Sequence, residues 1–320
     1  MLFDRAVEGM YRANLFARQD NPNGIFYFSP ADFPGLQAHP YPFTARAGHT
    51  LQGWFYHYEN PIPGRLVVFD HGLGNGHRAY MKEIEQLAAA GYLVFSYDHT
   101  GCMESGGENT NGFSQSLNDL DCCITALKAE PALAGRRFSV TGHSWGGFST
   151  MNIAALHPEI DRVVSMSGFV SVQHILDQTF TGLLQIFRKS ILGLERRTNP
   201  DFVDFSAVDS LKKARAKVLL IYSADDSVVH KAAHYDVLYE NLRNRPNIRF
   251  LLVDGRDHSP NYTDDAAAYK TEFFNAFNEA LRKKQLATPE QQASFMARYD
   301  WHRMTAQDPE VWAAILDTLK

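Results

Sequence analysis

The sequence predicts an α/β protein in which a mainly parallel central sheet carries helices on both of its faces. Six short runs have the apolar, β-branched content of buried strands: RLVVFDHG (65–72), GYLVFSYD (91–98), RFSVTGHS (137–144), RVVSMSG (162–168), AKVLLIYSADD (216–226) and IRFLLVDG (248–255). Helical patterns separate most of them, over 78–90, 115–129, 147–156, 230–243 and 263–283. Strands that alternate with helices form βαβ units, whose strands pair in parallel and are covered on both sides.

Two segments flank this alternation. Residues 19–64 are rich in Pro, Gly and aromatic residues, which is typical of short strands and turns, and LQGWFYHY (51–58) has the content of a strand. PEQQASFMARY and PEVWAAILDTL predict two helices within 288–320, where Trp301 and Trp312 indicate packing on the body. We therefore expect an N-terminal extension (1–50) and a C-terminal helical extension (286–320).

The alternation breaks between Gly168 and Lys217, which about 48 residues separate. Connections of roughly four to six residues are usual between two elements. HILDQTFTGLLQIFRKSILGL (174–194) has helical apolar spacing, so we expect a helical cap over 169–216, inserted into a core of 51–168 and 217–285. The alternative is an ordinary extra helix that packs on the sheet.

Composition excludes several classes of function. Apolar residues make up 45% of the 320 residues and charged residues 21%, as in globular proteins, and the net charge of −5 argues against a nucleic-acid partner. Three cysteines do not make a disulfide framework. The N-terminal stretch lacks the apolar run of a secretory signal, and no stretch is apolar for the roughly 18 residues that a membrane span needs. We expect a cytoplasmic protein without a membrane span.

The motif G-x-S-x-G occurs at Gly142-His143-Ser144-Trp145-Gly146, between a predicted strand and a predicted helix. Glycines two residues before and after Ser144 allow the strand and the helix to approach closely in a sharp turn. The turn would hold the hydroxyl of Ser144 exposed above the carboxyl edge of the sheet. Ser144 is therefore the candidate nucleophile.

A serine nucleophile needs a histidine base, and the base needs an acid that orients it. In this architecture the chain order is serine, acid, histidine. His258 directly follows the last strand run, at the edge of the sheet where ligands bind. The loop after the penultimate run holds Asp225 and Asp226, and we select Asp226 because the turn leaves Asp225 nearer the strand end.

An oxyanion hole requires two backbone N–H donors. The residue after the nucleophile supplies one, which is Trp145, and the glycine-rich loop at 71–76 supplies the other, for which we select Leu73. This loop lacks the spacing of a phosphate or dinucleotide motif. His71, His77 and His99 lack the partners of a known metal motif, and His71 is expected to shape the oxyanion loop. We expect neither a metal nor a cofactor.

Together these features resemble the α/β-hydrolase superfamily over roughly residues 50–285. The resemblance rests on the loop at 71–76, Asp98-His99-Thr100-Gly101 with Ser105-Gly106, the elbow at 142–146, the acid loop at 223–229 and His258. It implies the fold, the catalytic roles and a cap inserted after the sixth strand of that fold.

One segment resembles particular members of this superfamily. SYDHTGCMESGG is similar to the D-x-x-G-x-G-x-S segment of monoglyceride-lipase-like and serine-aminopeptidase-like members, with Met103 in place of the second glycine. Elbows with Trp after the serine also occur in prolyl-oligopeptidase-like and dienelactone-hydrolase-like branches. The resemblance does not imply a substrate.

The sequence therefore predicts a serine hydrolase that cleaves a carboxylic ester or a related acyl bond of a small-molecule substrate. The apolar cap pattern makes Phe180, Leu184 and Phe187 candidate substrate contacts, although this face could equally pack on the sheet. Three alternatives stay open: an acyl-peptide or prolyl-type serine peptidase, an acyltransferase, and a non-catalytic ligand receptor on the same scaffold. The sequence leaves the oligomeric state open, a homo-oligomer included.

Overall fold

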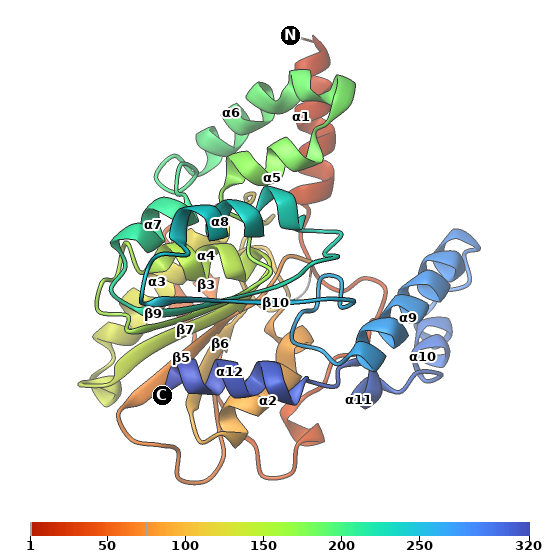
Figure 1. The fold of residues 1–320 in the computed structure, drawn as a ribbon. Helices are drawn as coiled ribbons and strands as arrows, with labels where there is room; N and C mark the ends of the chain where they lie inside the picture. The colour runs from red at the N-terminus through yellow and green to blue at the C-terminus, as the bar shows by residue number, and fades with distance from the viewer. Residues whose placement is uncertain (1, 75) are drawn as a thin grey trace.

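The computed structural model describes residues 2–74 and 76–320, with Met1 and Asn75 outside the described residues. Within this part of the chain, one sheet of eight strands forms the centre of the molecule (Figure 1). In spatial order its strands are β1 (Gln37–Pro40), β4 (Gly53–His57), β6 (Leu93–Tyr97), β5 (Arg65–Asp70), β7 (Arg137–His143), β8 (Arg162–Met166), β9 (Lys217–Ser223) and β10 (Ile248–Val253). The pairs β1–β4 and β4–β6 are antiparallel, and all other neighbours are parallel. The predicted α/β-hydrolase fold, with a mainly parallel sheet, is confirmed.

The strands form where the chain can be buried on both faces of the sheet. Every residue of β5 and of β6 is buried, and Val67 of β5 lies between Val94 of β6 and Ser139 of β7. Parallel strands covered by helices on both sides are uniformly apolar for this reason. The strand β1 lies within the segment expected to be an extension, and it forms an edge of the sheet.

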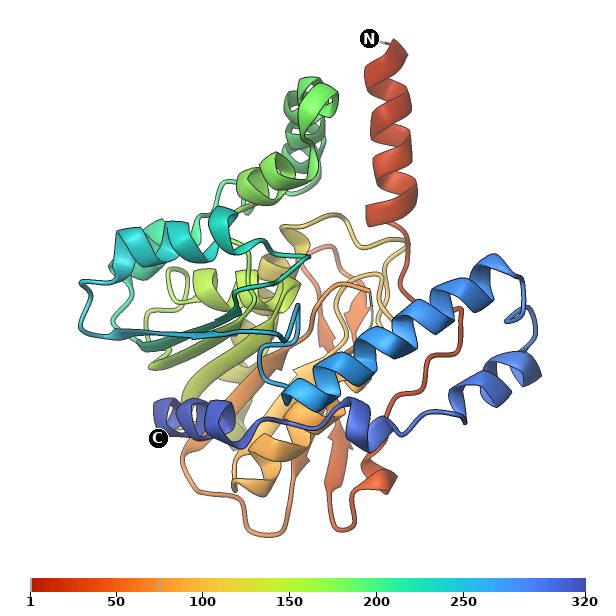
Figure 2. The ribbon, with the colours of Figure 1, turned by 45° about the vertical axis from the view of Figure 1, so that its right-hand side comes forward.

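Helices cover the two faces of the sheet. One face packs against α3 (Gln115–Ala129), α4 (Trp145–Ile153), α7 (Ala207–Lys213) and α8 (Tyr235–Leu242). The other packs against α2 (Met81–Ala89) and α12 (Pro309–Leu319) (Figure 1). Trp312 of α12 is buried in this contact. A third apolar cluster joins α9 (Asp264–Arg282), α10 (Pro289–Met296) and α11 (Trp301–Met304), which lie together at the side of the sheet (Figure 2).

The segment after β8 rises above the sheet as α5 (Val172–Thr179), a 3-10 turn (Gly182–Phe187) and α6 (Arg188–Thr198) (Figure 2). The helical spacing over 174–194 is thus interrupted. Gly182 has φ +57°, a conformation that favours glycine and ends a regular helix. We name the segment from α5 to α6 the cap, and the interruption leaves Leu183 91% exposed and Ile186 72% exposed at its tip.

The helix α1 (Leu2–Leu15) packs beside α6 of the cap. The sequence of this stretch does not by itself predict this helix. Glu8 of α1 forms an ion pair with Arg197 at 3.0 Å and accepts a hydrogen bond from Ser190 at 2.8 Å. The N-terminal helix is therefore held by residues of the cap that lie far from it in the sequence.

In the described part of the chain, no helix is both long and apolar enough to cross a bilayer.

Candidate active site

Ser144 stands at a sharp turn between β7 and α4. It has φ +57°, a backbone conformation that is rare for residues other than glycine. A Cβ on Gly142 would lie 2.5 Å from the carbonyl oxygen of Gly146, and a Cβ on Gly146 would lie 2.1 Å from that of Asp70. Only glycine fits at both positions, so the strand and the helix approach closely enough to hold Ser144 at the tip of the turn.

The loops after β9 and β10 bring a carboxylate to a histidine. Nδ1 of His258 lies 2.9 Å from Oδ2 and 3.0 Å from Oδ1 of Asp226. The Asp226 carboxylate also accepts the backbone N–H groups of Val228 and Val229. Burial raises the pKa of Asp226, but the hydrogen bond and charge of His258 outweigh it, so that the pKa is lowered. Asp226 is therefore a charged acceptor that fixes the imidazole.

Asp225 has a different role in the same two loops. Its Oδ1 accepts the backbone N–H groups of Arg256 at 3.2 Å and of Asp257 at 3.3 Å, and it also accepts the hydroxyl of Ser223. These bonds join the end of β9 to the loop that carries His258. Asp225 therefore holds the loop, while Asp226 holds the ring.

His143, the residue before Ser144, contacts the loop of His258 directly. Its Nε2–H donates to the carbonyl oxygen of His258 at 2.7 Å, and the two rings are 4.7 Å apart. Its Nδ1 accepts the hydroxyl of Tyr80 at 2.9 Å. Burial lowers the pKa of His143, which stays neutral. Asp226 occupies Nδ1 of His258, so Nε2 is the ring nitrogen that this contact does not use.

The loop after β5 passes close to Ser144. A Cβ on Gly72 would lie 2.4 Å from the hydroxyl oxygen of Tyr80 and 3.3 Å from Cβ of Ser144, so the backbone next to Leu73 passes close to Ser144. His71 donates from Nδ1 to the carbonyl of Gly72 at 2.7 Å. Its Nε2 accepts the N–H of His99 at 3.0 Å, and burial lowers its pKa to about 3. A neutral His71 thus fixes this loop, in which Asn75 lies outside the described residues.

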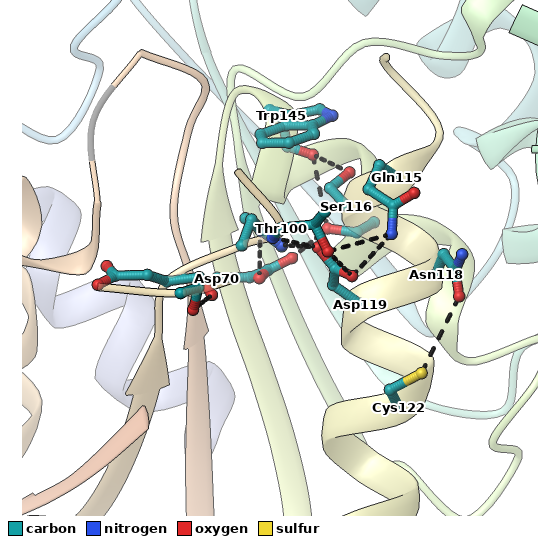
Figure 3. Close-up of polar contacts among 12 residues, drawn as sticks. Asp70, Thr100, Gln115, Ser116, Asn118, Asp119, Cys122 and Trp145 are labelled. Atoms are coloured by element: carbon teal, nitrogen blue, oxygen red, sulfur yellow. Dashed lines mark hydrogen bonds and ion pairs between the residues drawn. The ribbon is translucent and has the colours of Figure 1, made fainter. Parts of the chain in front are cut away.

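Trp145 begins α4, where a backbone N–H has no acceptor within the helix. Its side chain and its carbonyl are both held in place. The indole N–H donates to the carbonyl of Phe113 at 2.5 Å, and the hydroxyl of Ser116 donates to the carbonyl of Trp145 at 3.2 Å (Figure 3). Trp145, the residue after Ser144, is thus fixed at the start of α4.

A buried polar cluster lies beneath Trp145. Asp119 of α3 accepts the backbone N–H and the hydroxyl of Thr100, each at 2.8 Å, and the amide of Gln115 at 2.8 Å (Figure 3). His99 lies 2.9 Å from Asp70 and 3.3 Å from Asp119. Burial lowers the pKa of His99, but the two carboxylates raise it to about 9. The charged cluster ties the loop after β6 to α3 below the elbow.

The cap and α1 enclose an apolar cavity of about 400 Å³. Its walls include Tyr11 and Leu15 of α1, Leu176 of α5, Phe113 and Phe180. The other residues proposed from sequence as substrate contacts lie elsewhere: Leu184 is 53% exposed at the tip of the cap, and Phe187 is partly buried, with neither in the wall of this cavity. Of the three residues proposed from sequence, Phe180 thus lines this cavity, whereas Leu184 and Phe187 do not.

Comparisons with known proteins agree with this architecture. A family model described as serine aminopeptidase, S33, matches residues 61–204. "Putative carbamate hydrolase RutD" of Rhizobium rhizogenes is 30% identical over 195 residues, which cover 60% of this chain and 69% of that protein. The chain belongs to the α/β-hydrolase superfamily. "Uncharacterized protein YfhR" of Escherichia coli O157:H7 is 27% identical to this hydrolase, with coverage of 75% of this chain and 80% of YfhR.

Among solved structures, the esterase Pf2001 of Pyrococcus furiosus has a TM-score of 0.59 to this hydrolase at 19% sequence identity. The match covers 84% of this chain and 98% of the esterase, and it shows a common fold.

Several residues that lie around Ser144 and the cap could not be singled out from the sequence. Tyr80 and Tyr11 are ordinary aromatic residues in the sequence, and only the fold brings Tyr80 to His143 and Tyr11 to Glu195. Asp119 carries a weak signal, because QSLND (115–119) places polar residues in a helix that is buried. Within the ranges described, no group of three or more His, Cys, Asp or Glu side chains is arranged to hold a metal ion.

Proposed function

We propose that this α/β hydrolase cleaves carboxylic esters through an acyl-enzyme formed on Ser144, with His258 as general base and Asp226 as the orienting acid. The single observation that supports this best is the 2.9 Å contact between Asp226 and Nδ1 of His258, a residue whose carbonyl bonds to His143, next to Ser144 in the chain. An imidazole whose Nδ1–H is held by a carboxylate presents an unprotonated Nε2, which is the form that a general base requires.

The proposed reaction has two halves. Nε2 of His258 takes the hydroxyl proton as Oγ of Ser144 attacks the ester carbonyl, and the backbone N–H groups of Leu73 and Trp145 stabilise the oxyanion. The protonated His258 then gives its proton to the departing alcohol, which leaves an acyl group on Ser144. A water molecule, deprotonated by His258, attacks the acyl-enzyme, and the protonated His258 returns this proton to Oγ of Ser144 as the carboxylic acid is released.

The cavity between α1 and α5 supports an apolar acyl group as the preferred guest. Its wall contains Leu15, Leu176, Phe113 and Phe180, and no charged residue among those that the structure describes lines it. Burial of an acyl chain there would contribute roughly 0.8 kcal/mol per methylene. We therefore propose esters of small to medium acyl chains as substrates.

Two measurements on purified protein test the proposal. Ser144→Ala is expected to lose labelling by a fluorophosphonate probe and all ester hydrolysis, while Ser190→Ala, a serine of the cap, keeps both. Retention of full activity by Ser144→Ala would exclude the mechanism.

The same protein is then given p-nitrophenyl esters alongside aminoacyl and prolyl amides. Preference for the esters supports the proposed substrate class. A clear preference for amides would favour a peptidase, the activity after which the matching family model is described.

A further inference from the structure

A second cavity, of about 130 Å³, lies apart from the cap, where the chain before β1 crosses between α2 and α9. Tyr80 and His143 of the candidate active site line it, whereas Ser144, Asp226 and His258 do not. Its walls come largely from segments outside the match to the family model, namely residues 25–28, α9 and α11. A cavity of roughly 150 Å³ holds one benzene ring, so the volume fits a single ring.

Aromatic side chains form the outer wall of this cavity. The rings of Phe26 and Trp301 are 5.3 Å apart, and Phe273 lies 5.1 Å from both Phe274 and Trp301. Phe26 and Phe274 are each 37% exposed, which is unusual for phenylalanine and leaves their rings available at the surface. The wall therefore offers ring faces and edges to an aromatic guest.

A lysine and a glutamate, which form no ion pair with each other, line the cavity. Nζ of Lys270 donates to the hydroxyl of Ser259 at 2.8 Å and lies 5.0 Å from the centre of the Tyr262 ring. Among the described residues, no carboxylate forms an ion pair with Lys270. Burial lowers the pKa of Lys270, whereas the nearby charges of Glu83 and Asp257 raise it, so a bound anion would further stabilise the ammonium group.

Glu83 of α2 supplies the second group. Its side chain is 2% exposed, and its Oε1 accepts the amides of Asn261 at 2.9 Å and Gln307 at 3.3 Å. Its Oε2 is buried and has no hydrogen-bond partner within the described part of the chain. Burial raises the pKa of Glu83, which favours the protonated carboxyl, a hydrogen-bond donor.

We propose that this cavity is a binding site for a small aromatic carboxylate. The ring would lie among Phe26, Phe274 and Trp301, and the carboxylate would receive hydrogen bonds from Lys270 and from the carboxyl of Glu83. Such a ligand would form an ion pair with Lys270, which forms none among the described residues, and would accept a hydrogen bond from Oε2 of Glu83. Arg78 and Lys82 also line the cavity, and their positive charge favours the approach of an anion.

The proposal is tested by calorimetric titration of the Ser144→Ala protein with three ligands of equal size: benzoate, benzyl alcohol and benzylamine. Benzoate is expected to bind with a Kd of about 1 mM or tighter, and the other two at least about tenfold more weakly. Absence of benzoate binding would overturn the proposal. Stronger binding of benzylamine would overturn it as well, because Glu83 would then act as an anion.

Variants locate the binding. Lys270→Met is expected to weaken benzoate binding at least about tenfold, and Lys270→Arg to restore most of it. Lys283→Met, just beyond the end of the same helix, is the matched control and is expected to bind as the parent does. Thermal unfolding of each variant shows whether it is folded. If folded Lys270→Met binds benzoate as tightly as the parent, the ligand lies elsewhere and the assignment is wrong.

Discussion

Asp226 and His258 lie 32 positions apart in the chain, and their side chains meet at 2.9 Å between the ends of β9 and β10. The neighbouring Asp225 is as close in sequence but bonds to backbone N–H groups of the same histidine loop. Two adjacent carboxylates thus divide two tasks: one orients a ring and the other holds a loop. This division can be measured one residue at a time.

Asp226→Asn is expected to lower kcat for ester hydrolysis by a factor on the order of 10⁴, because an amide can hold His258 in the wrong tautomer. Asp225→Asn is the control, since its amide oxygen still accepts the N–H groups of Arg256 and Asp257, and a loss within about tenfold is expected. Steady-state kinetics of the two variants separate the roles. A larger loss in Asp225→Asn than in Asp226→Asn would reverse the assignment.

Gly72→Ala is expected to lower kcat by about tenfold or more. The added Cβ would lie 2.4 Å from the hydroxyl oxygen of Tyr80, so the loop must shift and carry the N–H of Leu73 away from Ser144. The double variant with Tyr80→Phe removes that hydroxyl and should recover part of the loss. Wild-type activity in Gly72→Ala would show that the loop position does not matter for turnover.

The cavity under the cap predicts a change in chain-length preference. Leu176→Trp fills space between α1 and α5, and we expect the ratio of kcat/KM for p-nitrophenyl octanoate to that for the acetate to fall about tenfold. Leu184→Trp, at the exposed tip of the cap, should leave the ratio unchanged. If the tip variant alters the ratio and the cavity variant does not, the acyl chain binds at the tip.

Glu195 of α6 predicts a pH dependence of stability. It accepts the hydroxyl of Tyr11 at 2.6 Å and the N–H of Phe113 at 3.1 Å. Burial raises its pKa from 4.5 to about 7, against the effect of those hydrogen bonds. The folded state keeps a proton that the unfolded state loses, so the free energy of unfolding should fall between pH 4.5 and 7 by an amount on the order of 3 kcal/mol.

Urea denaturation at pH 5 and pH 8 measures this contribution. Glu195→Gln cannot ionise, so the difference in stability between the two pH values should shrink relative to the wild type. Glu8→Gln is the comparison, because the hydrogen bond from Ser190 and the charge of Arg197 lower the pKa of Glu8 and its contribution is lost only on acidification. An unchanged difference in Glu195→Gln would mean that this carboxyl is ionised in the folded state.

Much of the fold could be predicted because buried parallel strands have a strong local signature. RLVVFD has a continuous apolar run at its centre because both faces of β5 are covered. The glycines two residues before and after Ser144 indicate that two backbones approach closely there. The loops that hold Asp226 and His258 follow from strand order alone. These features depend on short stretches of chain.

The remainder depends on contacts that no short stretch contains. Apolar spacing over 174–194 does not show that Gly182 takes a positive φ and turns Leu184 to the surface. The docking of α1 on the cap rests on Tyr11 and Glu195, which have no distinctive sequence context. The pairing of two such side chains follows only from the arrangement of the whole chain.

The position of α1 has a consequence for biosynthesis. Tyr11 leaves the ribosome 184 residues ahead of Glu195, its partner on α6. At the usual rates of translation the first helix therefore waits roughly 10 to 40 seconds before its docking surface exists. During that interval its apolar side is open to chaperones and to neighbouring nascent chains, so slow synthesis of the first 195 residues is expected to favour aggregation more than slow synthesis of the rest.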